Sequence, residues 1–253
     1  MKTQHITLSC TPFLAVALIA CGSEELSEAE SDDVAQTVSA LTFEDGGESD
    51  AATDIAALME GALPSSFSED GSGVFTRTRG TLSYEYAITC FDADGEVLET
   101  CGPSARSAEV ALAVVGSWAS PRRSADLERE GQWSVDWDGE DLFVINGQAN
   151  GTFNTEFEAL NRNDMRTYIM VHDTQANDAV FDASIDRFTG GTFTHAVAAD
   201  RTRTTDFRDV VASFDATAEV AFQADGPPLI TINGERVYEA NPVTGAVEPE
   251  AEQ

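Results

Sequence analysis

Bulky apolar residues alternate with polar residues along much of the chain, and residues 74–90 show the pattern most clearly. Most of the bulky side chains there share even positions, namely Val74, Leu82, Tyr84, Tyr86 and Ile88, with Phe75 as the exception. A period of two residues is that of a β-strand with one buried face. The pattern therefore predicts one long half-buried strand, or two strands that join at Gly80.

Nine further stretches read as strands, because they alternate in the same way or are rich in β-branched and aromatic residues. They are 107–118, 125–137, 141–147, 151–159, 166–173, 179–188, 191–199, 208–222 and 229–238. Helical patterns do not alternate with them, which argues against a parallel sheet. We expect a mainly β fold, an antiparallel β-sandwich or meandering barrel of roughly ten strands.

Two segments of the predicted sheet share the pattern DGxxLx[VT]ING. They are residues 138–147 and 225–234, which lie 87 positions apart. Each reads as an Asp-Gly turn, a strand and an Asn-Gly turn. The two segments mark either two related halves of the sheet or a coincidence of common hairpin residues.

Before the strands, apolar residues follow a helical spacing. Ile55, Leu58, Met59, Ala62 and Leu63 lie on one face of a helix over residues 52–63, and Pro64 would end it. The preceding acidic residues 21–51 largely lack bulky side chains and read as a mostly disordered tether, although 34–41 is compatible with a short helix. We expect the β-rich domain to span 52–241 and an acidic disordered tail to span 242–253.

The N-terminus has the form of a secretory signal. Lys2 precedes an apolar stretch over about residues 6–20, which is shorter than the roughly 20 residues of a transmembrane helix. The stretch ends in Leu18-Ile19-Ala20-Cys21, which resembles the lipobox of bacterial lipoprotein precursors. That resemblance implies removal of residues 1–20 and lipidation of Cys21. The alternative is an ordinary secretory signal with a chance cysteine.

The residue after the lipidated cysteine carries the sorting information in bacterial lipoproteins. Here it is Gly22 and not Asp, the usual inner-membrane retention signal, so the resemblance implies the outer membrane. We expect the mature chain to contact the membrane through its anchor, since two or three acyl chains make anchoring stable.

Charge narrows the range of partners. Asp and Glu total 45 against 14 Lys and Arg, a net charge of −31, and Lys2 is the sole lysine. Nucleic-acid binding needs a basic patch, and the sequence shows none. Direct contact of the domain with lipid headgroups is disfavoured for the same reason. The composition suits a solvated surface in a salty medium, and cation capture is the functional alternative.

Four cysteines reduce to one pair. Cys10 leaves with the signal and Cys21 takes lipid, which leaves Cys90 and Cys101 to form a disulfide in an oxidising compartment. If the two cysteines face each other, the hairpin is centred between Gly95 and Glu96. A type I′ turn at Asp94-Gly95 would instead place Cys90 opposite Glu99.

Few residues suggest chemistry. His172 and His195, with Asp173 or Asp200 nearby, are candidates for a metal ligand or general base, and the alternative is a histidine held within the sheet. Trp133 and Trp137 suit either sugar stacking or a core. Two acidic turns are weak calcium candidates, with plain hairpin turns as the alternative. Their carboxylates are Asp92, Asp94 and Glu96 in one turn, and Asp136, Asp138 and Asp141 in the other.

No catalytic residue is assigned. Ser117 lacks the flanking glycines of a nucleophile elbow, and the mature chain has no lysine for Schiff-base chemistry. We therefore expect a lipid-anchored cell-envelope protein with a non-enzymatic binding or structural role toward an unidentified protein or glycan. The alternatives are a calcium-stabilised adhesion module and a hydrolase that uses carboxylates or histidine.

Overall fold

A computed structural model describes residues 26–63, 65–69, 73–120, 123–158, 165–204 and 209–250. Two helices come first, α1 (Glu28–Phe43) and α2 (Glu48–Met59). The strands that follow are β1 (Phe67–Glu69), β2 (Val74–Arg79), β3 (Leu82–Phe91), β4 (Ser107–Ser120), β5 (Arg123–Trp137), β6 (Leu142–Glu158), β7 (Met165–Asp182), β8 (Arg187–Thr204), β9 (Asp209–Ala221), β10 (Leu229–Ile232), β11 (Arg236–Ala240) and β12 (Val247–Pro249).

The twelve described strands form one open antiparallel sheet, and each strand pairs with its neighbours in the chain. The prediction of a mainly β, antiparallel fold is confirmed. Several predicted strands are parts of longer ones, since 141–147 and 151–159 both belong to β6. A bulge at Ile145/Gly147 lets the chain bend there without leaving the sheet.

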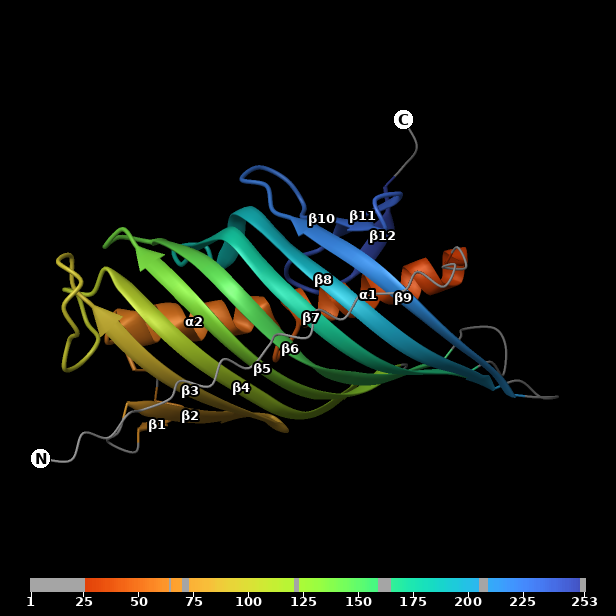
Figure 1. Ribbon diagram of the computed structural model, residues 1–253, viewed down its shortest axis with the longest axis horizontal. Coiled ribbons are helices and arrows are strands. Elements are labelled where there is room, and N and C mark those ends of the chain that lie inside the picture. The colour runs from red at the N-terminus through yellow and green to blue at the C-terminus, as the bar shows by residue number, and fades with distance from the viewer. Residues whose placement is uncertain are drawn as a thin grey trace, which may run out of the picture.

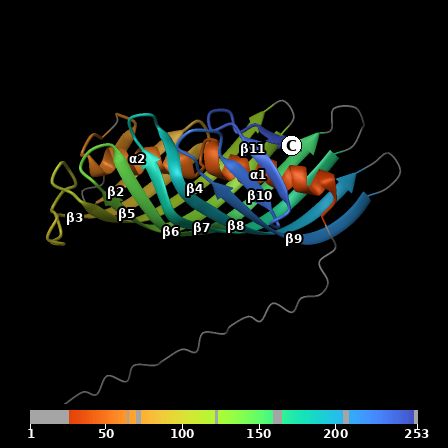
Figure 2. The same cartoon turned by 90° about the horizontal axis from the view of Figure 1, so that it is seen from above.

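The sheet curves around both helices (Figure 1, Figure 2). Its inner face carries most of the aromatic residues, whereas the helices present mostly small side chains such as Val34, Ala35 and Ala51. Phe188, Phe193 and Phe222 pack together beneath Phe43 at the end of α1. Small helical residues allow the helices to approach a layer of large rings closely, so the two surfaces fill one core.

The expectation of a mostly disordered tether over 21–51 is wrong for its described part. Residues 28–43 are α1, and ten of them are buried, including Asp33, Val38 and Leu41. The second helix begins at Glu48, four residues before the predicted start at 52, and ends at Met59. The acidic segment folds because the sheet supplies partners for its carboxylates, and those partners are distant in the sequence.

The predicted disordered tail is also wrong in part, because β12 pairs with β11. Asn241 accepts backbone hydrogen bonds from Val243 and Thr244 through its side chain, and these bonds form the turn between the two strands. Ser39 of α1 donates to the carbonyl of Gly245 at 2.9 Å. The C-terminal turn is thereby attached to the helix.

The two similar segments have different structures. In residues 225–234, Asn233 and Gly234 have positive φ and turn the chain from β10 into β11. In residues 138–147, Asn146 and Gly147 lie inside β6, and the Asn146 side chain exchanges hydrogen bonds with Asp178 on β7. The Asn-Gly turn expected in the first segment is therefore absent.

Candidate functional site

The predicted disulfide between Cys90 and Cys101 is confirmed, with the two Cα atoms 5.4 Å apart. Neither predicted hairpin register is found. Phe91 lies opposite Val97, and the Leu98 amide donates to the Cys90 carbonyl. Cys101 belongs to the long connection between β3 and β4, so the disulfide attaches this connection to the end of β3. Cys21, the proposed lipidation site, lies outside the described residues.

The calcium candidates serve as turn formers. Asp92 accepts hydrogen bonds from the backbone amides of Asp94 and Glu96, and Asp138 does the same for Glu140 and Leu142. Asp136 lies within β5, and Asp141 lies in the turn before β6. Within the described ranges, no group of three or more His, Cys, Asp or Glu side chains is placed to hold a metal ion.

The two histidines meet beneath the helices. His172 on β7 and His195 on β8 are 1% and 0% exposed. Thr174 lies between them, with its hydroxyl 2.9 Å from His195 Nδ1 and 3.4 Å from His172 Nδ1. Thr42 of α1 approaches His195 Nε2 at 3.5 Å. Burial lowers the pKa of His172 to about 4 and that of His195 to about 3, so both rings are neutral at pH 7.

Beside the histidines lies a buried ion pair that joins Arg129 on β5 to Glu48 at the start of α2. Both side chains have no exposed surface. Burial raises the pKa of Glu48, and the neighbouring Arg129 guanidinium opposes that shift. The charge of Arg129 also helps to keep both histidines neutral. This pair could not be predicted from the sequence, because nothing local distinguishes Glu48 from the other acidic residues of the chain.

Each of the four tyrosines in the chain donates its hydroxyl to an aspartate on a helix. Tyr84 bonds Asp50 and Tyr86 bonds Asp54, both at 2.5 Å. Tyr168 bonds Asp33, and Tyr238 bonds Asp32 at 2.9 Å. All four tyrosines belong to the sheet, so phenol–carboxylate hydrogen bonds join both helices to it along their length.

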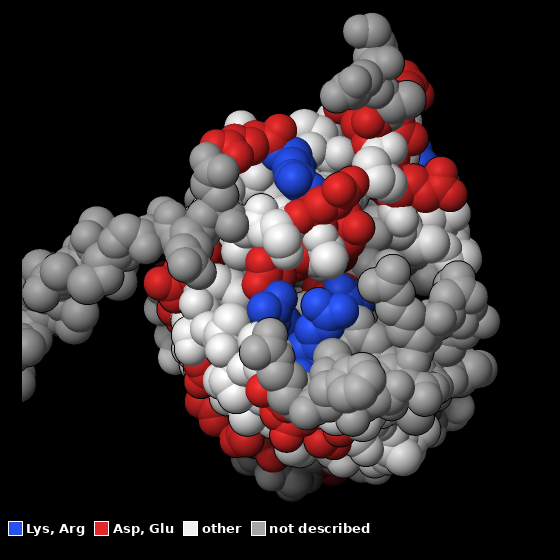
Figure 3. All heavy atoms as spheres, turned by 90° about the vertical axis from the view of Figure 1, so that its right-hand side faces the viewer, with Lys and Arg blue, Asp and Glu red and all other residues white. Residues whose placement is uncertain are grey.

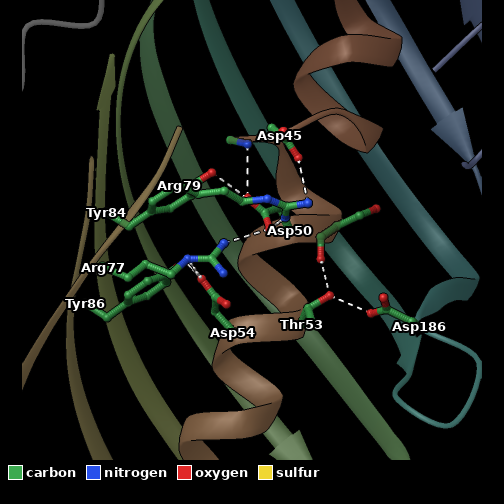
Figure 4. A network of polar contacts seen from close by, with 11 residues as sticks. Asp45, Asp50, Thr53, Asp54, Arg77, Arg79, Tyr84, Tyr86 and Asp186 are labelled. Atoms are coloured by element: carbon green, nitrogen blue, oxygen red, sulfur yellow. Dashed lines mark hydrogen bonds and ion pairs between the residues drawn. The ribbon is translucent and has the colours of Figure 1, made fainter. Parts of the chain in front are cut away.

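Arginines complete the same network. Figure 4 shows Arg77 between two carboxylates of α2, with 2.7 Å from Nη2 to Asp50 and 2.7 Å from Nε to Asp54. Arg79 reaches Asp50 at 2.7 Å and Asp45 at 3.0 Å. The guanidinium of Arg77 also lies 4.4 Å from the centre of the Tyr84 ring.

The two carboxylates that share Arg77 titrate differently. Burial raises the pKa of Asp54 to about 7, although Tyr86 and Arg77 oppose the shift. The pKa of Asp50 is lowered, because hydrogen bonds from Tyr84 and Arg77 and the charge of Arg77 outweigh burial. For Asp50 the contacts with Tyr84 and Arg77 therefore outweigh burial, whereas for Asp54 burial outweighs the contacts with Tyr86 and Arg77.

These arrangements hold the helices against the sheet and leave the two histidines, Glu48 and Arg129 almost fully buried, whereas Arg79 and Asp45 remain exposed. Trp133 and Trp137 are buried as well, which favours the core alternative over sugar stacking. A general base must reach a substrate within hydrogen-bond distance. Neither histidine does so in this structure, since both are almost fully buried and Thr42 of α1 lies against His195.

A surface hollow of about 580 Å³ opens beside the first turn of α1. It lies where β10 and β11 separate from β9, because β10 pairs only with residues 218–221 of that strand. Its walls are mixed, with apolar Leu26, Val197 and Ile232 alongside charged Asp215 and Arg236. This hollow is a surface concavity and does not reach the histidines.

No family model, curated protein or solved structure matches this chain. None of the helices in the described part of the chain is both long and apolar enough to cross a membrane.

Proposed function

We propose that this protein is a lipid-anchored cell-envelope protein, sorted to the outer membrane, with a non-enzymatic binding or structural role. The Leu18–Cys21 lipobox and Gly22 support the anchor and the sorting. The observation that carries the non-enzymatic role is that the concave face of the sheet is occupied by the protein's own helices. Tyr–Asp and Arg–carboxylate pairs hold those helices in place, and the surfaces left for a partner are external.

The hydrolase alternative needs a histidine or a carboxylate of raised pKa in an open cleft. His172, His195 and Asp54 have shifted pKa values, but all three lie in the contact between helices and sheet. Their shifts are explained by structural burial. The calcium-stabilised alternative has less support, because the described residues include no group of three or more His, Cys, Asp or Glu side chains that could hold the ion.

The anchor is tested by mass spectrometry of the N-terminal peptide from the membrane fraction. We expect a peptide that begins at Cys21 and carries a diacylglyceryl thioether and an acylated α-amine. A Cys21→Ser variant should remain unlipidated and is the control. An unmodified Cys21, or cleavage at any other bond, would refute the proposal.

Sorting is tested separately with a Gly22→Asp variant. We expect the wild-type protein in the outer-membrane fraction and the variant in the inner-membrane fraction after density-gradient separation. Both proteins should carry the same lipid, since Cys21 is unchanged. Identical distributions of the two proteins would argue against outer-membrane sorting by this signal.

A further inference from the structure

The anchor and the fold are separated by very little chain. Leu26 is the first described residue, and Ser27 caps α1 through reciprocal hydrogen bonds with Glu30. Four residues separate Cys21 from Leu26, which makes five Cα–Cα steps, and a fully extended chain spans at most about 3.6 Å per residue. If Cys21 is lipidated, as the proposed function holds, Leu26 lies within about 18 Å of the anchored cysteine.

The first turns of α1 lie at one end of the sheet. Glu30 pairs with Arg201 at 2.5 Å, and Asp33 pairs with Arg166 at 2.8 Å. Arg166 is near the start of β7, and Arg201 is near the end of β8. We call this the β7–β9 end and define it as residues 165–171, 198–204 and 209–213. It lies on the right of Figure 1, where α1 begins.

The outer face of the β7–β9 end exposes apolar side chains. Ten large hydrophobic residues are exposed in the described part of the chain, and four of them lie here: Met165, Ile169, Val171 and Val211. The cross-strand register places Thr167, Thr202 and Val211 side by side, so the exposed residues of β7 and β9 belong to one face. Such a cluster is typical of a surface that contacts another phase or partner.

Charge is divided between the two ends of the sheet. The β7–β9 end has three arginines and two aspartates, and two of those arginines, Arg166 and Arg201, pair with Asp33 and Glu30 of α1. Figure 3 shows basic atoms gathered at the middle of this side of the molecule, with acidic residues beside them. The opposite acidic end, residues 92–99, 138–141 and 182–186, has nine acids and no Lys or Arg. An anionic bilayer attracts each nearby basic residue by about 1 kcal/mol and repels acids. The acidic end is therefore the costlier one to hold against a membrane.

We propose that the β7–β9 end lies against the phospholipid surface in which Cys21 is anchored, and that the acidic end points away from it. The short connection from Cys21 to α1 and the greater acidity of the opposite end favour the same orientation. Exposed apolar residues occur at both ends, with Val97, Leu142 and Ile185 at the acidic one, so those at the β7–β9 end are compatible with this orientation but do not select it. The total charge argues against headgroup contact by the domain as a whole, but the distribution of charge permits contact at this end.

The test is energy transfer from a labelled protein to a fluorescent lipid. Met165→Cys places a thiol at the β7–β9 end, and Leu142→Cys places one at the acidic end. The two parent side chains are similarly exposed, at 44% and 40%. Leu142 is the first residue of β6, and Met165 pairs with Glu158, its last residue. The two positions are therefore separated by the length of β6, which is about 50 Å at roughly 3.3 Å per residue. Cys90 and Cys101 are paired and Cys21 would carry lipid, so each variant has one free thiol.

Each lipidated variant is labelled and reconstituted in phosphatidylethanolamine–phosphatidylglycerol vesicles with a rhodamine-labelled lipid. The mass of the N-terminal peptide is measured first, so loss of the anchor is distinguished from a wrong orientation. We expect severalfold greater transfer from position 165 than from position 142. Equal transfer from both positions, or greater transfer from 142, would overturn the proposed orientation, and a partner other than the bilayer would then account for the apolar cluster.

Discussion

At the scale of single residues, the Glu48–Arg129 ion pair stands out among the ion pairs of the described residues, because neither partner has exposed side-chain surface. Burial of two charges is costly, and it is tolerated because each charge compensates the other. Removal of one partner would leave the other charge uncompensated in the interior. The pair therefore makes the position of α2 depend on β5.

We expect Arg129→Met to lower the free energy of unfolding by about 3–5 kcal/mol, because Glu48 would remain buried without its partner. The control is Arg79→Met, which removes a guanidinium that is 53% exposed and should cost at most about 1 kcal/mol. Urea unfolding followed by circular dichroism measures both. Equal losses of unfolding free energy in the two variants would show that the buried ion pair contributes no more stability than the exposed Arg79 guanidinium.

The histidines predict a pH dependence. A histidine whose pKa is lowered in the folded state takes up a proton in the unfolded chain first, so its contribution to stability falls as the pH falls from about 6.5. For His195, with its pKa at about 3, this window reaches down to pH 3. Relative to a His195→Gln variant, the wild type should lose about 1.4 kcal/mol per pH unit in that window.

Two carboxylates act in the opposite sense over an overlapping range. Burial raises the pKa of Asp33 to about 6 and that of Asp54 to about 7, so each contributes more stability as the pH falls and loses it as the pH rises through these values. Both carboxylates remain in the His195→Gln variant, so their contributions to the unfolding free energy cancel when the variant is compared with the wild type. The difference in unfolding free energy between the wild type and the His195→Gln variant should change between pH 6.5 and pH 4. A constant difference would contradict the lowered pKa of His195.

At the scale of elements, the corner between α1 and α2 leaves no room for a side chain at Gly47. Gly46 has φ of +85°, and a Cβ atom at Gly47 would lie 2.7 Å from the Leu41 carbonyl and 2.8 Å from the Glu44 carbonyl. These carbonyls end α1 and cannot withdraw without unwinding it. The corner brings Glu48 to Arg129 and Asp50 to Arg77, so its geometry sets both ion pairs.

Gly47→Ala should therefore destabilise the protein by about 1–3 kcal/mol through overpacking against backbone. Gly102→Ala is the matched control, because no atom lies within 4 Å of its added Cβ. Thermal unfolding compares the two variants. A Gly47→Ala protein as stable as the control would show that the corner can relax.

The connection between β3 and β4 depends on its disulfide. Cys90 is buried at the end of β3, and the bond to Cys101 attaches a segment that contains the acidic turn at Asp92. A Cys90→Ala/Cys101→Ala variant should lose about 3 kcal/mol, as expected for a loop of this length. Denaturant unfolding with and without a reductant measures the effect. Reductant should destabilise the wild type and leave the variant unchanged.

At the scale of the whole molecule, the net charge of −31 acts against compactness. Repulsion among exposed acids is screened by salt, whereas the ion pairs between helices and sheet are largely buried and are screened less. We expect the melting temperature to rise as NaCl increases from about 0.05 to about 1 M. KCl should have the same effect if screening is the cause. A fall in melting temperature with salt would show that the ion pairs dominate.

Some of this fold was predictable from local sequence, and some signals were overlooked. Ser27 and Glu30 form a capping box of the S-x-x-E type directly before α1, and this signal could have predicted the helix. The acidic composition and the lack of bulky residues pointed instead to disorder. Composition alone misleads here, because Asp33 is compensated by Arg166 and Tyr168, more than 130 positions away.

The sequence by itself determined most of the strands, their antiparallel arrangement, the Cys90–Cys101 pair and the expectation of an anchor at Cys21, but not β1, β12 or the division of 229–238 into β10 and β11. Period-two alternation, cysteine count and the lipobox are local or countable patterns. Tertiary structure alone decided that the acidic segment is helical, that His172 and His195 are buried together, and that the tyrosines bind helix aspartates. These features depend on ion pairs, hydrogen bonds and burial between residues that are distant in the chain, and those contacts exist only once the sheet has curved around the helices.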